Sequence, residues 1–353
     1  MQNPPIEIPE RYEPTGTVFT GAQGDVFLCR DTNLNRDVAI KFARDTTNPA
    51  TLLGEVRALA SIQSKHVIRL YDVIDSPDSN IIGLIVEFLP GDDLSQYCAR
   101  DVRELLLIMY QIACGLSDIH AAQTIHRDVK PKNMKFGDDG ILKLFDFGLS
   151  CQTDDAETEV ARGTRVYRGP EYYNPPPITL TDAADTYAFG VTVWWLVANS
   201  FPWQLRDTPP KRPDSFATHA LPLPARIVDL LDRTFDPDPD KRPSIVAIRD
   251  EIARQLLFGQ HRARFSDGTR SVEVTEVGKA VRVSLNQECS AVILYDGLEF
   301  RLSAVIGDVF LNGVAATAGD LLPDSCVLIL GDASMEYNRK FVTFDVSHPE
   351  VVL

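Results

Sequence analysis

The chain has 353 residues, of which 44% are hydrophobic and 24% charged, and it carries a formal net charge of −15 at pH 7. No apolar run is long enough to span a bilayer, and the first residues lack the basic and apolar segments of a secretory signal. Proteins that bind nucleic acids usually show a basic face, and the sequence contains no obvious Lys/Arg cluster. We therefore expect a cytoplasmic protein with no membrane insertion and no nucleic-acid partner.

The chain is longer than a single hydrophobic core usually supports, so two domains are expected. β-type runs with one helix come first, a mostly helical part follows, and short β-type runs separated by Gly, Asn or Asp close the chain. The expected segments are a lead-in at residues 1–11, a β-rich part at 12–88, a helical part at 89–258, a linker at 259–269 and a β domain at 270–353. The pattern of short β-type runs in the last part is typical of a β-sandwich or β-barrel.

Two glycines, Gly21 and Gly24, lie between predicted strands. Glycine lets the backbone approach a phosphate and present N–H donors, although a plain hairpin turn explains the same pattern. Lys41 ends an apolar strand, where an ammonium group needs a partner to offset its burial. A ligand phosphate and a carboxylate would serve, and Glu55 on the predicted helix 51–62 is the available carboxylate, with a solvated helix face as the alternative.

The strongest single motif is the run His-Arg-Asp-Val-Lys-Pro-Lys-Asn at residues 126–133. It places a candidate base, Asp128, a cation, Lys130, and a metal-binding amide, Asn133, in one loop. Asp146 follows an apolar strand and precedes Phe-Gly, a good position for binding Mg²⁺, which prefers oxygen ligands. A chance match to the full set in this order is rare.

In the order and spacing of these motifs, residues 12–257 resemble the eukaryotic-like (Hanks-type) serine/threonine protein kinase family as found in bacteria. The resemblance implies an α+β, bilobal protein kinase fold, with a β-rich N-lobe at 12–88 and a helical C-lobe at 89–258, followed by the all-β sandwich domain. It also implies ATP and Mg²⁺, or Mn²⁺, as cofactors.

The resemblance implies a role for each matching residue. Lys41 would hold the α- and β-phosphates and pair with Glu55, Asp128 would accept or orient the substrate hydroxyl, and Lys130 would neutralise the γ-phosphoryl group. The implied metal ligands are Asn133 and Asp146. The implied ATP-binding positions are Gly21, Gly24, Val26, Ala39, Lys41, Glu87, Leu89 and Lys135. The implied structural residues are Glu171, Asp185 and Arg242.

The segment 163–171 resembles the peptide-docking part of a protein kinase, and Thr164 with Lys130 fits serine/threonine specificity. The implied function is a non-specific serine/threonine protein kinase of signal transduction that autophosphorylates its activation loop. Arg127, before the candidate base, suggests control by phosphorylation, and Thr158 and Thr153 are the expected sites. A solvated acidic loop is the alternative for this stretch.

Two positions depart from the family pattern. Phe19 replaces the first glycine of the phosphate loop, and Lys135 replaces an apolar residue expected under the adenine. The methylene stem of Lys135 could still cover the ring. These departures leave an alternative open, a nucleotide-binding pseudokinase scaffold that acts through its C-terminal domain.

The C-terminal β runs resemble a forkhead-associated (FHA) domain in three motifs, which are Val277-Gly278-Lys279, Leu311-Asn312-Gly313 and residues 319–322. The resemblance implies binding to phosphothreonine proteins. Lys279 stands where that family has an arginine that grips the phosphate. Ser290 is in a plausible position, but Ile293, three residues later, stands where the family has a partner histidine. A β domain that docks on the kinase or mediates assembly is the alternative.

Overall fold

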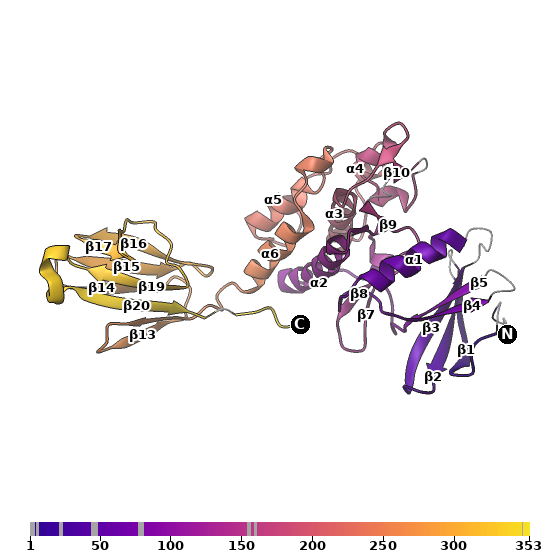
Figure 1. Cartoon of the computed structure of the whole chain (residues 1–353). Coiled ribbons are helices and arrows are strands. Elements are labelled where there is room, and N and C mark those ends of the chain that lie inside the picture. Colours follow the sequence, from indigo (N-terminus) through magenta and orange to yellow (C-terminus); the bar gives the residue numbers. More distant parts are fainter. Residues whose placement is uncertain are drawn as a thin grey trace. The chain divides into compact units, whose positions relative to one another are not determined.

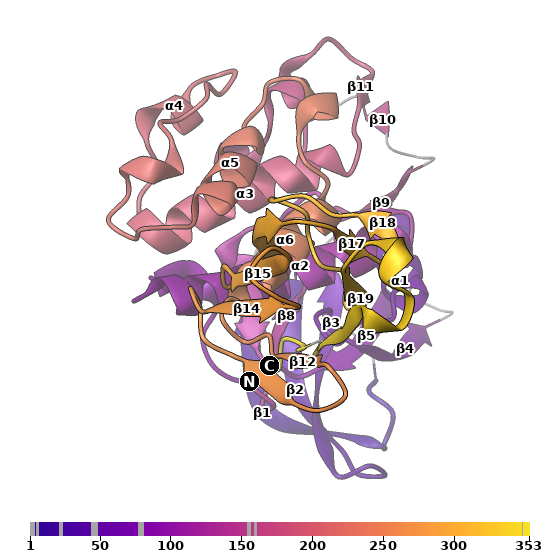
Figure 2. The same cartoon turned by 90° about the vertical axis from the view of Figure 1, so that its left-hand side faces the viewer.

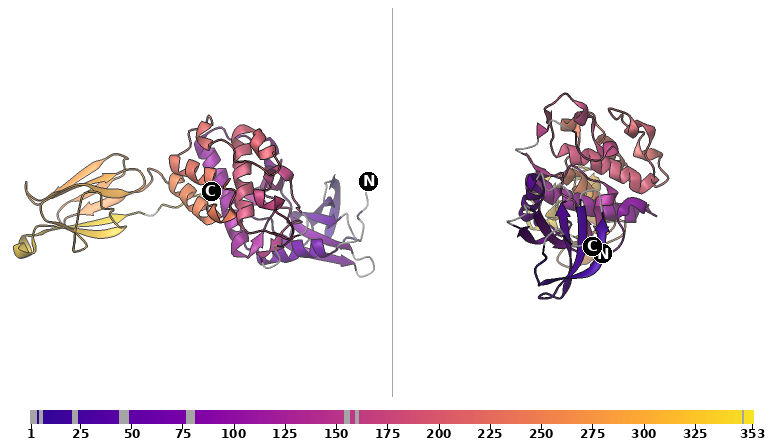
Figure 3. Two further views of the ribbon diagram at one scale, coloured as in Figure 1. Left: turned by 90° about the horizontal axis from the view of Figure 1, so that it is seen from above. Right: turned by 90° about the vertical axis from the view of Figure 1, so that its right-hand side faces the viewer.

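A computed structural model describes residues 4, 7–20, 24–43, 49–76, 81–153, 157–158, 161–347 and 349–353 (Figure 1). The chain forms two compact units, Met1–Ile252 together with Leu353, and Ala253–Val352. The first unit consists of a β-rich lobe and a helical lobe (Figure 3).

The β-rich lobe is an antiparallel sheet of five strands in the order β1-β2-β3-β5-β4, with one helix, α1 (Pro49–Ser61). The strands are β1 (Tyr12–Thr20), β2 (Gly24–Asp31), β3 (Arg36–Ala43), β4 (Leu70–Ser76) and β5 (Ile81–Glu87). Side chains alternate between the faces of a strand, and on β3 Val38, Ile40 and Phe42 belong to a buried core. Ala39 and Lys41 therefore point to the opposite face of the sheet.

The helical lobe contains α2 (Val102–Ala121) and α3 (Ala183–Ala198), most of whose side chains are buried; both helices are labelled in Figure 2. Its other helices are α4 (Trp203–Arg206), α5 (Ala225–Arg233) and α6 (Ile245–Leu256), of which α6 runs across the division between the units. α2 begins after Asp101, whose carboxylate accepts the N–H of Glu104 at 2.8 Å, a capping bond that satisfies one of the helix's unpaired donors. No helix within the described ranges combines the length and apolar character needed to cross a bilayer.

Short paired strands hold the loops of the helical lobe. They are β6 (Thr124–Ile125) with β9 (Cys151–Gln152), β7 (Met134–Phe136) with β8 (Leu142–Leu144), and β10 (Glu157–Thr158) with β11 (Ile178–Thr179). The 126–133 loop therefore runs from β6 to β7, and Asp146 follows β8. This arrangement explains how two motifs that are separate in the sequence reach one site.

The second unit is a β-sandwich. Its strands are β12 (Ala263–Ser266), β13 (Ser271–Val274), β14 (Ala280–Ser284), β15 (Ser290–Tyr295), β16 (Phe300–Ile306), β17 (Val309–Leu311), β18 (Val314–Ala315), β19 (Ser325–Leu330) and β20 (Lys340–Val346). A six-stranded sheet, β13-β12-β20-β19-β17-β18, and a three-stranded sheet, β14-β15-β16, share one core. Ile293 and Leu302 enter that core from the smaller sheet, and Leu328 and Phe344 from the larger one.

The predicted architecture, a β-rich lobe and a helical lobe followed by an all-β sandwich, is confirmed. The structure differs within the predicted linker at 259–269, because residues 263–266 form β12, which pairs with both β13 and β20. Ala263 and Phe265 are buried there. Four residues with only two inward side chains carry too little alternation to be recognised as a strand in the sequence.

Candidate functional site

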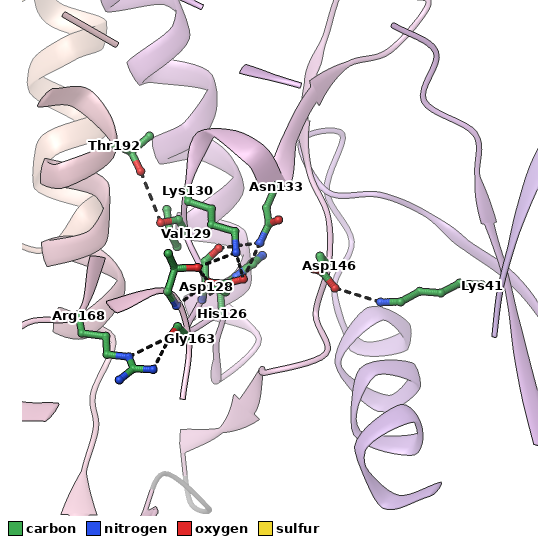
Figure 4. Close-up of polar contacts among 11 residues, drawn as sticks. Lys41, His126, Asp128, Val129, Lys130, Asn133, Asp146, Gly163, Arg168 and Thr192 are labelled. Carbon is green, nitrogen blue, oxygen red and sulfur yellow. Dashed lines mark hydrogen bonds and ion pairs between the residues drawn. The ribbon is translucent and has the colours of Figure 1, made fainter. Parts of the chain in front are cut away.

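The 126–133 loop places its polar side chains around Asp128 (Figure 4). The Asp128 carboxylate is 3% exposed, and its Oδ2 accepts hydrogen bonds from Lys130 Nζ at 2.6 Å and from Asn133 Nδ2 at 2.9 Å. Asn133 Nδ2 also donates to the backbone carbonyl of Asp128 at 2.9 Å. The predicted candidate base, cation and amide therefore meet in one cluster.

The neighbours of Asp128 keep it ionised. Burial raises the pKa of this carboxyl, but the hydrogen bond and positive charge of Lys130 outweigh burial, so the pKa lies below its ordinary value. An ionised carboxylate at this point can orient a hydroxyl group and accept its proton.

Thr164 approaches the same carboxylate from the segment that follows Gly163. Its hydroxyl donates to Asp128 Oδ1 at 3.1 Å and accepts from Lys130 Nζ at 2.8 Å. The end of the predicted activation segment is thus hydrogen-bonded directly to the candidate base. This contact orders the segment beside the position that an acceptor hydroxyl would occupy.

Asp185 of α3 accepts hydrogen bonds from the backbone of the 126–133 loop. Its fully buried carboxylate accepts the N–H groups of His126 and Arg127, each at 2.8 Å, and pairs with His120 Nε2 at 3.0 Å. Arg127 has a φ of 67°, a backbone conformation that costs energy in a residue with a side chain. The bonds to Asp185 stabilise that conformation, so Asp185 positions the loop and does not face a substrate.

Lys41 joins the two lobes at the site. Its ammonium group contacts Glu55 at 2.8 Å and Asp146 at 3.0 Å. Glu55 is 4% exposed, so the solvated-face alternative for this residue is wrong. Burial lowers the pKa of Lys41, but the two carboxylates outweigh burial and raise the pKa, so the ammonium group stays charged.

Asp146 also sits in a strained backbone conformation, with a φ of 71°. The next residue, Phe147, is buried, and its ring lies against the His126 ring with centroids 4.7 Å apart. Packing of Phe147 therefore fixes the direction in which the Asp146 carboxylate leaves the backbone. Strain at both Arg127 and Asp146 is typical of a functional site.

Asn133 and Asp146 are suitable for a magnesium site. Both nitrogen-bound hydrogens of the Asn133 amide point to Asp128, which leaves the amide oxygen as the acceptor available to a cation. Together with the Asp146 carboxylate this is a hard oxygen set of the kind Mg²⁺ takes, because Mg²⁺ completes its shell with waters and substrate phosphates. Within the described residues, no group of three His, Cys, Asp or Glu side chains forms an all-protein metal site.

The predicted nucleotide-binding residues lie along the face of the sheet opposite the core. Val26 is directly opposite Lys41 across β2 and β3, and Ala39 is directly opposite Val86 across β3 and β5, so these side chains share one face. Glu87 ends β5, and Leu89 follows it and is buried. Lys135 is half-buried on β7, and Gly24 begins β2. Gly21 lies outside the described residues.

Phe19, the departure in the phosphate loop, packs against Phe88. Their ring centroids are 6.4 Å apart and their planes are 28° apart, a stacked arrangement, although Phe19 is still 49% exposed. The ring therefore ties the end of β1 to the segment between Glu87 and Leu89.

Lys143 is a residue that the sequence analysis missed. It lies on β8 with its side chain 3% exposed, and its ammonium group pairs with Glu87 Oε1 at 3.0 Å. This buried ion pair links the predicted adenine-binding segment to the strand that leads into Asp146. Lys41 was identified as a lone lysine in an apolar strand, and the same sequence signal would have identified Lys143.

Glu171 and Arg242 form the expected structural pair. Arg242 Nη1 and Nη2 donate to the two Glu171 oxygens at 2.8 and 2.7 Å, and the Arg242 side chain is fully buried. A bidentate pair of this kind fixes orientation as well as charge. It ties the 163–171 segment to the loop before α6.

The two predicted phosphorylation sites lie in different settings. Thr153 is exposed, and its hydroxyl donates to the Gln123 carbonyl at 2.8 Å. Thr158 is half-buried on β10, where it pairs with Ile178 of β11. Among the described residues, Arg127 Nε and Nη2 are buried and have no hydrogen-bond partner.

The β-sandwich places its predicted binding residues differently. Ser290 is 1% exposed and hydrogen-bonded to Arg282 Nη2 at 3.1 Å, and Ile293 is in the core. Lys279 is exposed, and its Nζ lies 3.9 Å from Glu276 Oε1. The Ser290 hydroxyl is therefore not presented to solvent in this structure.

Residues 12–253 match the family described as protein kinase domain. A serine/threonine-protein kinase of Corynebacterium efficiens is 30% identical over 58% of this chain and 44% of its own length. The serine/threonine-protein kinase PknA of Corynebacterium glutamicum is 31% identical over 58% of this chain and 48% of its own length. A probable serine/threonine-protein kinase of Clostridium acetobutylicum is 28% identical over 56% of this chain and 31% of its own length. The chain spans less than half the length of these relatives.

Proposed function

Because the chain belongs to the protein kinase domain family, we propose that it transfers the γ-phosphoryl group of ATP to Ser and Thr hydroxyls of proteins, as a non-specific serine/threonine kinase. We take residues 12–258 as its catalytic domain. The observation that carries the proposal is the cluster in which Lys130 and Thr164 both contact the ionised Asp128. The carboxylate can bind an acceptor hydroxyl, and the cation can bind the phosphate that this hydroxyl attacks. The Thr164 hydroxyl holds the docking segment next to both groups.

In this reaction a bond forms between the acceptor oxygen and the γ-phosphorus, and the bond to the β-phosphate oxygen breaks, releasing ADP. The Asp128 carboxylate orients the acceptor hydroxyl and takes its proton. Lys130 offsets the negative charge of the transferring group, and Lys41, held by Glu55, binds the α- and β-phosphates.

Asn133 and Asp146 would hold Mg²⁺, or Mn²⁺, which neutralises phosphate charge when bound. Val26, Ala39, Glu87, Leu89 and Lys135 would line the nucleotide site. Most of the catalysis is then positioning and electrostatics, since phosphoryl transfer needs little covalent chemistry from the protein.

The alternative of a pseudokinase scaffold has only Phe19 and Lys135 in its favour. The pairs that phosphoryl transfer needs, Lys41 with Glu55 and Asp128 with Lys130, have hydrogen-bonded geometry. We therefore favour the active enzyme.

Autophosphorylation at Thr158, or at Thr153, is the form of regulation that we propose. The buried, unpartnered nitrogens of Arg127 among the described residues support it, because a phosphate would supply their missing acceptors. Undiminished activity of Thr158→Ala together with Thr153→Ala would exclude this regulation.

For the β-sandwich, binding to phosphothreonine proteins stays a prediction. The Arg282 guanidinium beside Ser290 is the feature in its favour, and the burial of Ser290 counts against it. Titration calorimetry of the full chain with phosphothreonine peptides tests it, and absence of heat would leave docking or assembly as the role of this unit.

The first experiment is intact-mass analysis of the purified protein after incubation with ATP and Mg²⁺ or Mn²⁺, beside Asp128→Asn. We expect added phosphate on Ser or Thr of the wild type only, mapped by tandem mass spectrometry. The matched control, Asp138→Asn, changes an exposed carboxylate of the turn between β7 and β8 and should behave as wild type. No transfer by the wild type, either to itself or to a set of protein substrates, would overturn the proposed function.

A further inference from the structure

Four cations are close in the chain to groups of the candidate phosphate-transfer site, Lys132 to Asn133 and three arginines to Thr164. Lys132 lies in the 126–133 loop and is exposed, Arg162 and Arg165 flank Thr164 and are exposed, and Arg168 is half-buried. Because the three arginines recur at every third position and not in a run, they do not stand out as a basic cluster in a sequence of net charge −15. The fold brings the segment that carries the arginines to Asp128 through the hydrogen bond of Thr164.

Hydrogen bonds hold the segment that carries the arginines. Thr164, between Arg162 and Arg165, is bonded to both Asp128 and Lys130. The Arg168 guanidinium donates to the Gly163 carbonyl, with Nε at 3.0 Å (Figure 4). A substrate segment that presents its hydroxyl to Asp128 would therefore lie next to the segment that carries the three arginines.

In the part of the chain that the structure describes, none of Lys132, Arg162, Arg165 and Arg168 takes part in an ion pair, and the Arg165 guanidinium instead contacts the Thr208 hydroxyl. Elsewhere on the surface of the same unit cations have acidic partners, as in Arg100 with Glu104 and Lys211 with Asp207. A group of cations without ion-pair partners among the described residues is available to a ligand of opposite charge.

We propose that this kinase selects Ser and Thr acceptors flanked by Asp or Glu side chains. The inference rests on the proposed function and adds the substrate class. A carboxylate C-terminal or N-terminal to the acceptor would meet Arg165, Arg162 or Lys132, and arginine matches a carboxylate with two donors. Opposite charges also speed the encounter of substrate and enzyme, whereas a basic substrate would be repelled.

The test uses three sets of matched peptides with one Thr acceptor, in which the flanking residues are Asp, Ala or Lys. We expect the full chain with Mg²⁺-ATP to phosphorylate the Asp set with a kcat/KM about tenfold or more above that of the Lys set. Raising the salt concentration should narrow the difference, because exposed charges are screened. Equal rates for the three sets, or a preference for Lys, would overturn the inference.

A charge reversal separates the cations from other causes of selectivity. Arg165→Glu should reverse the preference toward the Lys peptides. The matched control is Lys65→Glu, an exposed lysine between α1 and β4 that should keep the wild-type preference. An unchanged preference in Arg165→Glu combined with Lys132→Glu would overturn the inference.

Failure of the proposed function would be distinguishable. If no peptide is phosphorylated, fluorescence anisotropy of the same labelled peptides still measures binding. Tighter binding of the Asp set, lost in Arg165→Glu, would support the acidic preference without the activity, and equal binding of all sets would contradict it.

Discussion

Thr164 and Asp128, 36 residues apart in the chain, share a hydrogen bond of 3.1 Å between hydroxyl and carboxylate. Because Lys130 Nζ contacts both partners, the three side chains form a closed triangle of polar contacts. This triangle connects the segment that would dock a substrate with the group that would receive the substrate's proton. The order of the docking segment and the orientation of the candidate base are therefore coupled.

Replacing Thr164 tests this coupling. Thr164→Ala removes both contacts, and we expect kcat for peptide phosphorylation to fall by about tenfold or more, since a positioned group commonly contributes that much. Thr164→Ser keeps the hydroxyl and should retain most of the activity. Equal kinetics of the Ala and Ser variants would mean that the hydroxyl does not position Asp128.

The Lys41–Glu55 pair makes a second prediction. Glu55→Gln keeps the shape of the side chain but removes one of the two carboxylates around Lys41, so we expect kcat/KM to fall by about tenfold to a hundredfold. Glu10→Gln, at an exposed position, is the matched control and should leave the rate unchanged. Full activity of Glu55→Gln would show that Asp146 alone suffices to hold the ammonium group.

Asp185 predicts a pH dependence of stability. Burial raises the pKa of this carboxyl, but the hydrogen bond and charge of His120 and the backbone bond from His126 outweigh burial and lower the pKa below its ordinary value. A carboxyl with a lowered pKa in the folded state stabilises the fold fully above its unfolded pKa. The contribution is lost as the pH falls through the folded pKa.

The measurement is the free energy of unfolding of wild type and Asp185→Asn by urea denaturation. We expect the variant to be less stable by about 3 kcal/mol, as for a broken buried charge network. The difference should be constant between about pH 8 and pH 5 and should narrow below about pH 4. A difference that grows as the pH falls from 8 to 5 would instead implicate protonation of a neighbouring histidine, which strengthens its pair with Asp185.

Phe19 predicts an effect on nucleotide affinity. Phe19→Gly restores the family's glycine but removes the stack on Phe88, and we expect the KM for ATP to rise about threefold to tenfold, because aromatic pairs of this kind contribute about 1 kcal/mol. The kcat should change little, since neither ring touches the 126–133 loop in the contacts above. A lower KM in Phe19→Gly would mean that the ring obstructs the nucleotide, and Phe19→Leu separates the loss of the ring from the added flexibility of glycine.

The sequence by itself determined the fold class and the chemistry that is local in the chain. Asp128, Lys130 and Asn133 lie within one loop, so their order alone predicts a shared site. Alternation along residues 36–43 likewise separates the core face of β3 from the face that carries Lys41. Such patterns can be read from the sequence because they depend on neighbouring residues and on the period of a strand, and not on distant parts of the chain.

Only the tertiary structure decided which distant side chains meet. The sequence left Glu55 as either an ion-pair partner or a solvated residue, and its burial beside Lys41 decided between them. Lys143 could have been singled out as a lysine in an apolar strand, but only the fold decided that it pairs with Glu87 and that Thr164 meets Asp128. The energy of an ion pair depends on distance and on exclusion of water, and both are set by the packing of the lobe around the loop.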